Sequence, residues 1–228
     1  MTAHKKFGFG MRALGMMAGV LMLAACGNGK SGDGAAKTDG FPPAAKTQIE
    51  VPADVAKSGT WGDVVYGDAN APVEIIEYAS ITCPHCAQFY RDEFPELKKE
   101  FIDTGKVKFI FRNFLLNRLD LAASTVARCG DMDTTKKLMQ ILYERQAQWE
   151  GSKTPEDELA AIARRVGISR TEFDRCLENT KMHEHLTKMS TIAQKQYQVK
   201  GTPTLFVNGI RIEGHGMDAI KKAIADAK

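Results

Sequence analysis

The sequence predicts an α/β fold in which a large all-helical insertion separates two groups of β-strands. The first group consists of two apolar runs, Val73–Tyr78 and Val107–Phe111, whose length and composition are typical of strands. The second group is a hairpin, in which an Asn-Gly turn joins Thr204–Val207 to Ile210–Ile212. Between the groups, residues from about 115 to 199 show helical patterning, and this stretch is too long for a simple connection.

The helices are predicted from their end signals. A helix is expected from Pro84 to about Asp103, because proline is favoured in a first turn, and a kink is expected at Pro95. Inside the insertion, Ser169–Glu172 fits a capping box and therefore predicts a helix start. A last amphipathic helix is expected over Met217–Ala227.

Several other residues are expected to serve the fold rather than the chemistry. The Lys and Arg residues on the helices are scattered, so we expect them in solvent. Strand and core positions, rather than a cofactor site, are expected for Phe109, Phe111, Phe114, Leu115 and Leu116. No phosphate-binding loop, catalytic triad or nucleotide fingerprint is present, and we expect no organic cofactor and no metal.

The N-terminus has the pattern of an export signal. Lys5, Lys6 and Arg12 precede a short apolar run over residues 13–25, which is too short to span a bilayer as a mature helix. The run closes on Leu-Ala-Ala-Cys26, which resembles the lipobox of bacterial lipoproteins and implies lipidation of Cys26. The alternative is a plain signal peptide with a chance cysteine.

Three segments follow from this pattern. Residues 1–25 are expected to be the signal peptide, 26–60 a flexible tether rich in Gly, Ala, Lys, Ser and Pro, and 61–228 the folded domain. The whole chain carries a formal charge of +3, with 31 basic and 28 acidic residues. Removing the three basic residues of the signal leaves 28 against 28, so the positive charge belongs to targeting and does not indicate nucleic-acid binding.

The Cys83-Pro84-His85-Cys86 tetrapeptide is the motif that carries chemistry. Two cysteines three apart at a helix start can form a reactive disulfide. The first lies where backbone N–H groups and the helix dipole stabilise a thiolate, and His85 can add a donor or a positive charge. A lower thiolate energy stabilises the reduced form and makes the disulfide a stronger oxidant.

Two other interpretations of this motif are weaker. Half of a zinc site would need further ligands, but Cys129 and Cys176 are isolated, and His183 and His185 are two apart and do not share a helix face. A purely structural disulfide is disfavoured because so tight a loop stabilises little.

The sequence here resembles a known family, the DsbA-type periplasmic oxidoreductases of the thioredoxin fold. The resemblance rests on the segment Glu77–Cys86, on the helical insertion and on Gly201–Thr204, and it covers about residues 61–228. It implies that Cys83 is the exposed nucleophile, that Cys86 is the resolving partner, and that the two form a redox-active disulfide.

The resemblance also implies roles for residues around the cysteines. His85 matches the residue that tunes thiolate stability, and Glu77 matches the buried acid that helps proton movement around Cys86. The alternative for Glu77 is a solvated carboxylate at a strand end. Thr202-Pro203 matches the cis-proline loop that packs on the cysteine pair and binds the substrate chain, although an ordinary proline before a strand is the alternative.

The remaining cysteines, Cys129 and Cys176, are expected to form a second, noncatalytic disulfide, as some members of this family have. Export places the chain in an oxidising compartment, which favours pairing. Two buried free cysteines that behave as small hydrophobic residues are the alternative.

These features together predict an enzyme that introduces disulfide bonds into exported proteins. The family implies reduced or unfolded exported proteins as substrates and a DsbB-like, quinone-linked membrane protein as reoxidant. We expect a monomer on the periplasmic side of a bacterial membrane, anchored by its lipid, and Gly27 in place of Asp after the lipidated cysteine favours the outer membrane. The alternatives are an isomerase or reductase of the same fold, and a chaperone-like or adhesive lipoprotein without enzymatic activity.

Overall fold

A five-stranded mixed sheet forms the centre of the domain. The computed structural model describes residues 61–227, so the expected signal peptide, Cys26 and the tether lie outside the described residues. The strands, in the sheet order β1-β3-β2-β4-β5, are β1 (Val64–Tyr66), β3 (Val107–Asn113), β2 (Val73–Ala79), β4 (Thr204–Val207) and β5 (Ile210–Arg211). β2 and β3 are parallel, whereas the β1–β3, β2–β4 and β4–β5 pairs are antiparallel.

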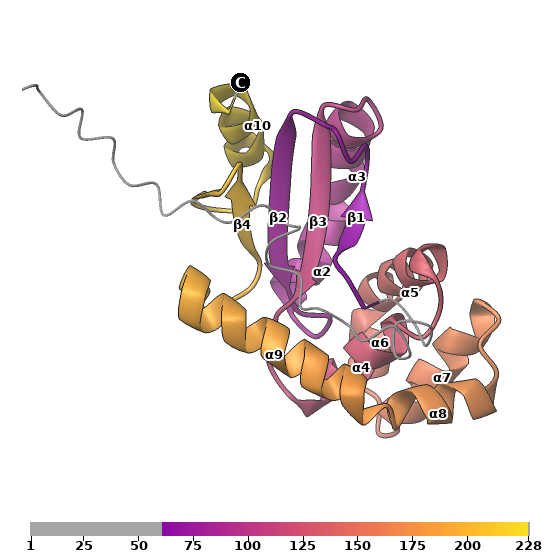
Figure 1. Cartoon of the computed structure of the whole chain (residues 1–228). Coiled ribbons are helices and arrows are strands. Elements are labelled where there is room, and N and C mark those ends of the chain that lie inside the picture. Colours follow the sequence, from indigo (N-terminus) through magenta and orange to yellow (C-terminus); the bar gives the residue numbers. More distant parts are fainter. Residues whose placement is uncertain (1–60, 228) are drawn as a thin grey trace, which may run out of the picture. The chain divides into compact units, whose positions relative to one another are not determined.

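The helices pack against the sheet or form the insertion between β3 and β4. Figure 1 shows the helical insertion beyond one end of the sheet, with α9 returning the chain to β4. The bounds are α2 (Pro84–Asp92), α3 (Phe94–Leu97), the π-helix η1 (Lys98–Ile102), α4 (Arg118–Ala127), α5 (Met132–Glu144), α6 (Gln146–Glu150), α7 (Pro155–Arg165), α8 (Arg170–Leu177), α9 (Thr180–Tyr197) and α10 (Met217–Asp226). The α/β fold with an all-helical insertion between two groups of strands is therefore confirmed.

The two faces of β2 carry different side chains because successive residues of a strand point to opposite sides. Ile75 and Ala79 pack in the main core with residues of α2, α5 and α10. Ile76 and Tyr78 pack on the other face, in a second core that includes residues of α9. Glu77 shares the parity of Ile75 and Ala79, so the strand directs its carboxyl group toward the α2 side.

Four details differ from the sequence expectations. The short strand β1 was not predicted, because three residues carry too little periodicity to recognise. The first helix is not continuous to Asp103 but ends at Asp92, and α3 and η1 follow it. Leu116 is 49% exposed rather than part of the core. Arg128, at the end of α4, is fully buried rather than solvated, because its guanidinium donates to Asn113 Oδ1 (2.8 Å) and to the Gly62 carbonyl (2.7 Å).

A buried ion pair fixes the start of the described chain to the sheet. The Arg112 guanidinium on β3 donates from Nε to Asp63 Oδ1 at 2.9 Å and from Nη2 to Asp63 Oδ2 at 2.8 Å, and both side chains are 3% exposed. This paired geometry satisfies both oxygens of the acid. The segment before β1 is thereby held against the central strands.

Candidate active site

Cys83 occupies the N-cap position of α2. Its backbone is extended, with φ −81° and ψ 120°, and Pro84 follows in the first turn of the helix. A sulfur at this position faces the unpaired N–H groups of the helix start. The pKa of Cys83 is lowered from 9.0 to about 5, chiefly because the Cys86 thiol donates a hydrogen bond to it, while burial opposes the shift.

Cys86, one turn inside α2, has the opposite character. It is 0% exposed, and burial, then its hydrogen bond to Cys83 and the negative charge of Glu77, raise its pKa well above 9.0. Both cysteines are free thiols in this structure, which therefore represents the dithiol form. Cys83 is only 4% exposed, so the expectation of an exposed nucleophile is wrong, because the Thr202-Pro203 loop packs over it.

The loop before β4 contacts the nucleophilic sulfur. The Thr202–Pro203 peptide bond is cis. Cys83 Sγ donates to the backbone carbonyl of Thr202 at 3.3 Å. The Thr202 hydroxyl is buried and has no hydrogen-bond partner among residues 61–227, yet its nearness to Cys83 helps to lower the pKa of that thiol. A rotation of this hydroxyl can therefore provide a donor when Cys83 is a thiolate.

Glu77 is the buried acid beneath the cysteine pair. It is 0% exposed, and neither of its carboxyl oxygens has a hydrogen-bond partner within the described part of the chain. Burial raises its pKa well above 4.5; the nearby Tyr90 hydroxyl lowers it, and the charge of Cys83 raises it. A carboxyl group in this setting can hold a proton near neutral pH and exchange it with a neighbouring thiol.

Tyr90 was not identified from the sequence as a site residue. It lies four residues after Cys86 on α2, so both side chains lie on the same face of the helix. Its hydroxyl is buried and has no hydrogen-bond partner among the described residues. The i, i+4 spacing from the second cysteine was the available signal, but a tyrosine at such a position is usually a core residue.

The exposed rim of the site contains two histidines. His85 is exposed on the first turn of α2, and its ring centroid lies 6.3 Å from that of His215, which precedes α10. His215 was also not identified, because it is 130 residues from His85 in the chain. The fold therefore places a second imidazole beside that of His85, which lies between the two cysteines in the sequence.

The loop that leads to Cys83 is held by side chains of the helical insertion. Gln146 donates from Nε2 to the carbonyl oxygens of Ile81 (2.8 Å) and Cys83 (3.0 Å). The Tyr143 hydroxyl donates to the Ser80 carbonyl at 3.1 Å. The insertion thus positions the nucleophile, a role that no local sequence pattern indicates.

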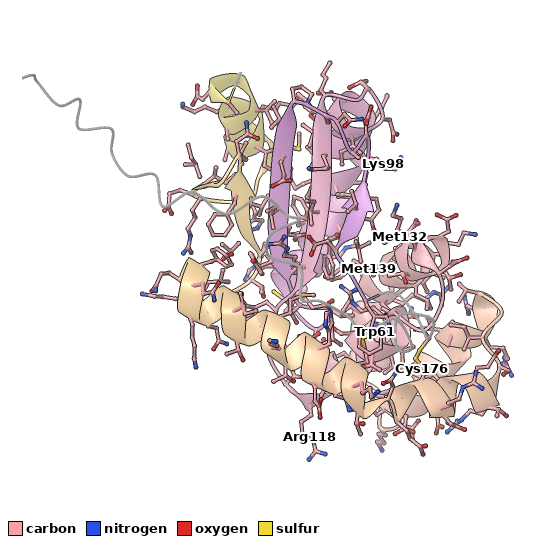
Figure 2. The ribbon with its side chains drawn as sticks, viewed as in Figure 1. Trp61, Lys98, Arg118, Met132, Met139 and Cys176 are labelled. Atoms are coloured by element: carbon pink, nitrogen blue, oxygen red, sulfur yellow. A yellow bond between two sulfur atoms is a disulfide. The ribbon has the colours of Figure 1, made fainter. Side chains whose placement is uncertain are left out.

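Cys129 and Cys176 form a disulfide with a Cα–Cα distance of 5.8 Å. Figure 2 places Cys176 in the helical insertion, where the bond joins the turn that follows α4 to α8. The alternative of two free thiols therefore does not hold in this structure. Among the described residues, the sulfurs of Cys129 and Cys176 contact the Thr125 carbonyl and not the Cys83–Cys86 pair.

No helix within residues 61–227 is both long and apolar enough to cross a membrane. No group of three or more His, Cys, Asp or Glu side chains in this range is placed to hold a metal ion.

The sheet, the helix-capping dithiol and the cis-proline loop define a class, that of thioredoxin-fold proteins with a paired-cysteine site. The model of the thioredoxin family matches residues 60–226. Disulfide bond formation protein D of Bacillus subtilis is 31% identical over 169 residues, which cover 72% of this chain and 76% of that protein. The chain belongs to the thioredoxin family, among its DsbA-like members.

Other relatives agree with this placement. A protein of Rickettsia typhi that bears the name of a protein-disulfide oxidoreductase is 36% identical over 163 residues, which cover 71% of this chain. The match spans only 60% of the length of that rickettsial protein.

Solved structures also resemble the fold. The oxidised BdbD of Bacillus subtilis has a TM-score of 0.66 at 28% identity and covers 72% of this chain and 92% of its own. The α-DsbA1 of Wolbachia pipientis has a TM-score of 0.67 at 24% identity and covers 81% of this chain and 97% of its own, which shows the shared fold.

Proposed function

We propose that this protein is a thiol oxidase that introduces disulfide bonds into exported proteins through Cys83 and Cys86. The observation that supports this proposal most strongly is the opposite behaviour of the two thiols. The pKa of Cys83 is about 5, whereas that of Cys86 lies well above its ordinary value. One sulfur is thus a stable anion at neutral pH and the other a protonated thiol.

The size of the effect favours oxidation of the substrate. Between a Cys83 pKa of about 5 and pH 7 lie two pH units, which at ~1.36 kcal/mol each stabilise the reduced form by about 2.7 kcal/mol over an ordinary thiol. For a two-electron couple this corresponds to about 60 mV. The disulfide form is the more oxidising by that amount.

The reaction proceeds in two exchanges. A substrate thiolate attacks Cys83 Sγ of the disulfide. A bond forms between the substrate sulfur and Cys83, the Cys83–Cys86 bond breaks, and Cys86 leaves and takes a proton. A second substrate thiolate then attacks the substrate sulfur of this mixed disulfide, and Cys83 leaves as a thiolate. The substrate gains one disulfide and loses two electrons, which the enzyme holds as its dithiol. Glu77 supplies and recovers the proton of Cys86.

The substrate chain is expected to bind along the Thr202-Pro203 loop. Leu116 is 49% exposed, and the next residue, Asn117, donates to Thr82 Oγ1 at 3.2 Å, so this apolar side chain lies beside the loop that precedes Cys83. An exposed leucine beside the loop that leads to Cys83 suits an unfolded chain with apolar segments.

The cellular setting belongs to the same proposal. Cys26, outside the described residues, carries the lipid that anchors a monomer on the periplasmic side of a bacterial membrane, with the outer membrane favoured. A DsbB-like membrane protein reoxidises the dithiol. Cys26→Ser is expected to move the protein from the membrane fraction to the soluble fraction, and unchanged partitioning would contradict the anchor.

Reduced, unfolded ribonuclease tests the activity. The oxidised wild type, in molar excess over the ribonuclease cysteines, is expected to restore ribonuclease activity without another oxidant, and Cys83→Ala to lose all exchange. In a buffer of reduced and oxidised glutathione, which supplies the oxidant, Cys86→Ala is expected to accumulate a mixed disulfide with ribonuclease through Cys83. If Cys83→Ala kept full function, a non-enzymatic chaperone would be the better description. A reduction potential near thioredoxin's ~−270 mV, measured against glutathione, would favour the reductase alternative.

A further inference from the structure

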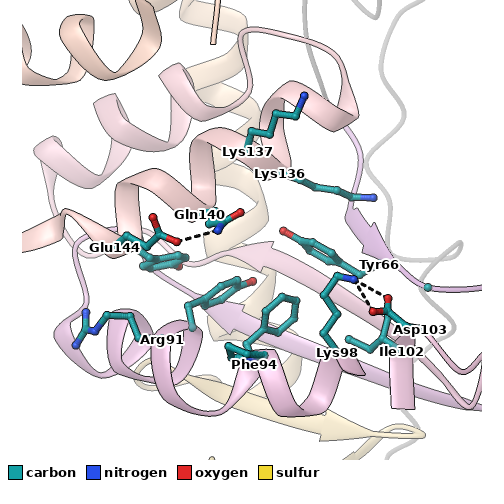
Figure 3. A pocket seen from close by; sticks show the side chains of 14 residues that line it. Tyr66, Arg91, Phe94, Lys98, Ile102, Asp103, Lys136, Lys137, Gln140 and Glu144 are labelled. Atoms are coloured by element: carbon teal, nitrogen blue, oxygen red, sulfur yellow. Dashed lines mark hydrogen bonds and ion pairs between the residues drawn. The ribbon is translucent and has the colours of Figure 1, made fainter. Parts of the chain in front are cut away.

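A cavity lies where the helical insertion meets the thioredoxin core, and its lining does not include the Thr202-Pro203 loop. This cavity has a volume of about 610 Å³ and is lined by residues of β1, α2, α3, η1 and α5. Figure 3 shows it between α5 on one side and the α2–η1 segment on the other. Cavities of this size at the junction of two structural units commonly bind small molecules.

One wall of the cavity is aromatic. Tyr90 stacks on Tyr143 with a centroid distance of 4.4 Å and on Phe94 at 4.7 Å, and Tyr66 meets Phe94 edge-on at 5.1 Å. These four rings pack against one another and give this side of the cavity an aromatic, apolar lining.

The rim of the cavity is positively charged. The ionisable lining residues, apart from the tyrosines, are four cations and two carboxylates, which gives 4 − 2 = +2; they are Arg91, Lys98, Lys136, Lys137, Asp103 and Glu144. Lys98 is paired with Asp103 at 2.6 Å, and Glu144 accepts from Gln140 at 2.8 Å. The other three cations take part in none of the ion pairs found within residues 61–227, although Lys137 helps to lower the pKa of Asp131. Lys136 Nζ lies 4.9 Å from the centroid of the Tyr66 ring.

We propose that this cavity binds a small organic anion with a flat aromatic body. The ring of the ligand lies against the aromatic wall, and its acidic group lies at Lys136 and Lys137. The aromatic wall requires an apolar body of the ligand, and the two excess positive charges select its sign. A π-helical turn, η1, forms part of the lining, and such turns are frequent at functional sites. The proposal does not depend on the redox activity, because neither Cys83 nor Cys86 lines the cavity.

A pair of matched probes tests the charge requirement. 2-Naphthoate and the uncharged 2-naphthylmethanol have the same ring system, and their affinities for the reduced protein can be compared by isothermal titration calorimetry. We expect saturable binding of the carboxylate at a stoichiometry of one, and binding of the alcohol at least about fivefold weaker, the combined effect of two charge contacts at the surface. Equal affinities, or no saturable binding of the carboxylate, would overturn the proposal.

Variants locate the site. Lys136→Gln with Lys137→Gln is expected to weaken the carboxylate about fivefold, whereas the matched pair Lys153→Gln with Lys195→Gln, exposed outside the cavity, leaves its affinity unchanged. Gln140→Trp, at an exposed lining position, fills the cavity without disturbing the core and is expected to abolish binding.

Backbone amide shifts give an independent measure. They are expected on η1 and α5 when 2-naphthoate binds, and circular dichroism shows whether each variant keeps its fold. The assignment of the cavity would be wrong if Lys136→Gln with Lys137→Gln bound 2-naphthoate as tightly as the wild type. It would also be wrong if the shifts clustered at Leu116 and Ile210, two exposed apolar residues outside the cavity.

Discussion

Replacing Glu77 by glutamine should stabilise the reduced protein as the pH rises. The carboxyl group is fully buried and has no hydrogen-bond partner among residues 61–227, so its charged form is costly to keep in the folded state. Its pKa in the folded state is raised well above the ordinary 4.5. When the pKa of an acid is higher in the folded than in the unfolded state, its contribution to the free energy of unfolding is complete below the pKa of the unfolded state. This contribution is lost as the pH rises toward the pKa of the folded state.

The magnitude follows from this linkage. From about pH 4.5 upward, and until the folded pKa is reached, the wild type should lose about 1.4 kcal/mol of unfolding free energy per pH unit relative to Glu77→Gln. Cys83 acts in the opposite direction, since its folded pKa of about 5 is below its ordinary 9.0 and its contribution grows as the pH rises between these values. Both proteins contain Cys83, so the difference between them isolates Glu77.

Urea denaturation of the reduced proteins at half-unit steps from pH 4.5 to 8.5 measures the difference. Glu74→Gln is the matched control, because Glu74 lies on the same strand but is half-buried and paired with Lys108 at 2.7 Å. Its difference from the wild type should stay below about 1 kcal/mol at all pH values. If Glu77→Gln and the wild type followed parallel curves, Glu77 would be an ordinary ionised carboxylate, and its proposed exchange of a proton with Cys86 would lose its basis.

Three further predictions concern the surroundings of the site. Thr202→Val removes the unpaired hydroxyl beside Cys83 and should raise the pKa of that thiol by about one to two units, the worth of one charge-assisted hydrogen bond. The pH dependence of alkylation measures this pKa. An unchanged pKa would mean that the hydroxyl does not donate to the thiolate. Cys129→Ala with Cys176→Ala removes a bond that closes a loop with a separation of 47 residues. It should lower the unfolding free energy in urea by ~4 kcal/mol on the chain-entropy model, with ribonuclease oxidation retained, and a loss below 1 kcal/mol would contradict that estimate. Asp63→Asn leaves its buried arginine partner without a counter-charge and should cost about 3 to 5 kcal/mol in the same assay, a result that a loss within the range of surface variants would refute.

The sequence was informative wherever the chemistry was local. The Cys83–Cys86 spacing, the proline after the first cysteine and the turn before Ile210 are each contained in a few residues, and the helix start and the hairpin lie where these signals predict. The capping box at Ser169 is confirmed for the same reason.

The features that were missed depend on distant parts of the chain. The burial of Cys83 results from a loop 119 residues away, and its carbonyl is held by Gln146 from the helical insertion. His215 reaches the rim only because the last helix packs against the sheet beside α2. Arg128 is buried where its guanidinium donates to Asn113 on β3 and to the carbonyl of Gly62 before β1, contacts that composition cannot reveal.

The account as a whole depends on one sulfur anion at the start of α2. The rate of iodoacetamide alkylation of the reduced protein, followed from pH 3 to 10 with the modified cysteine identified by mass spectrometry, measures it directly. We expect modification at Cys83 alone, with a half-maximal rate near its pKa of about 5. A half-maximal rate near pH 8.5, as for an ordinary free cysteine, or equal labelling of Cys86, would contradict the account.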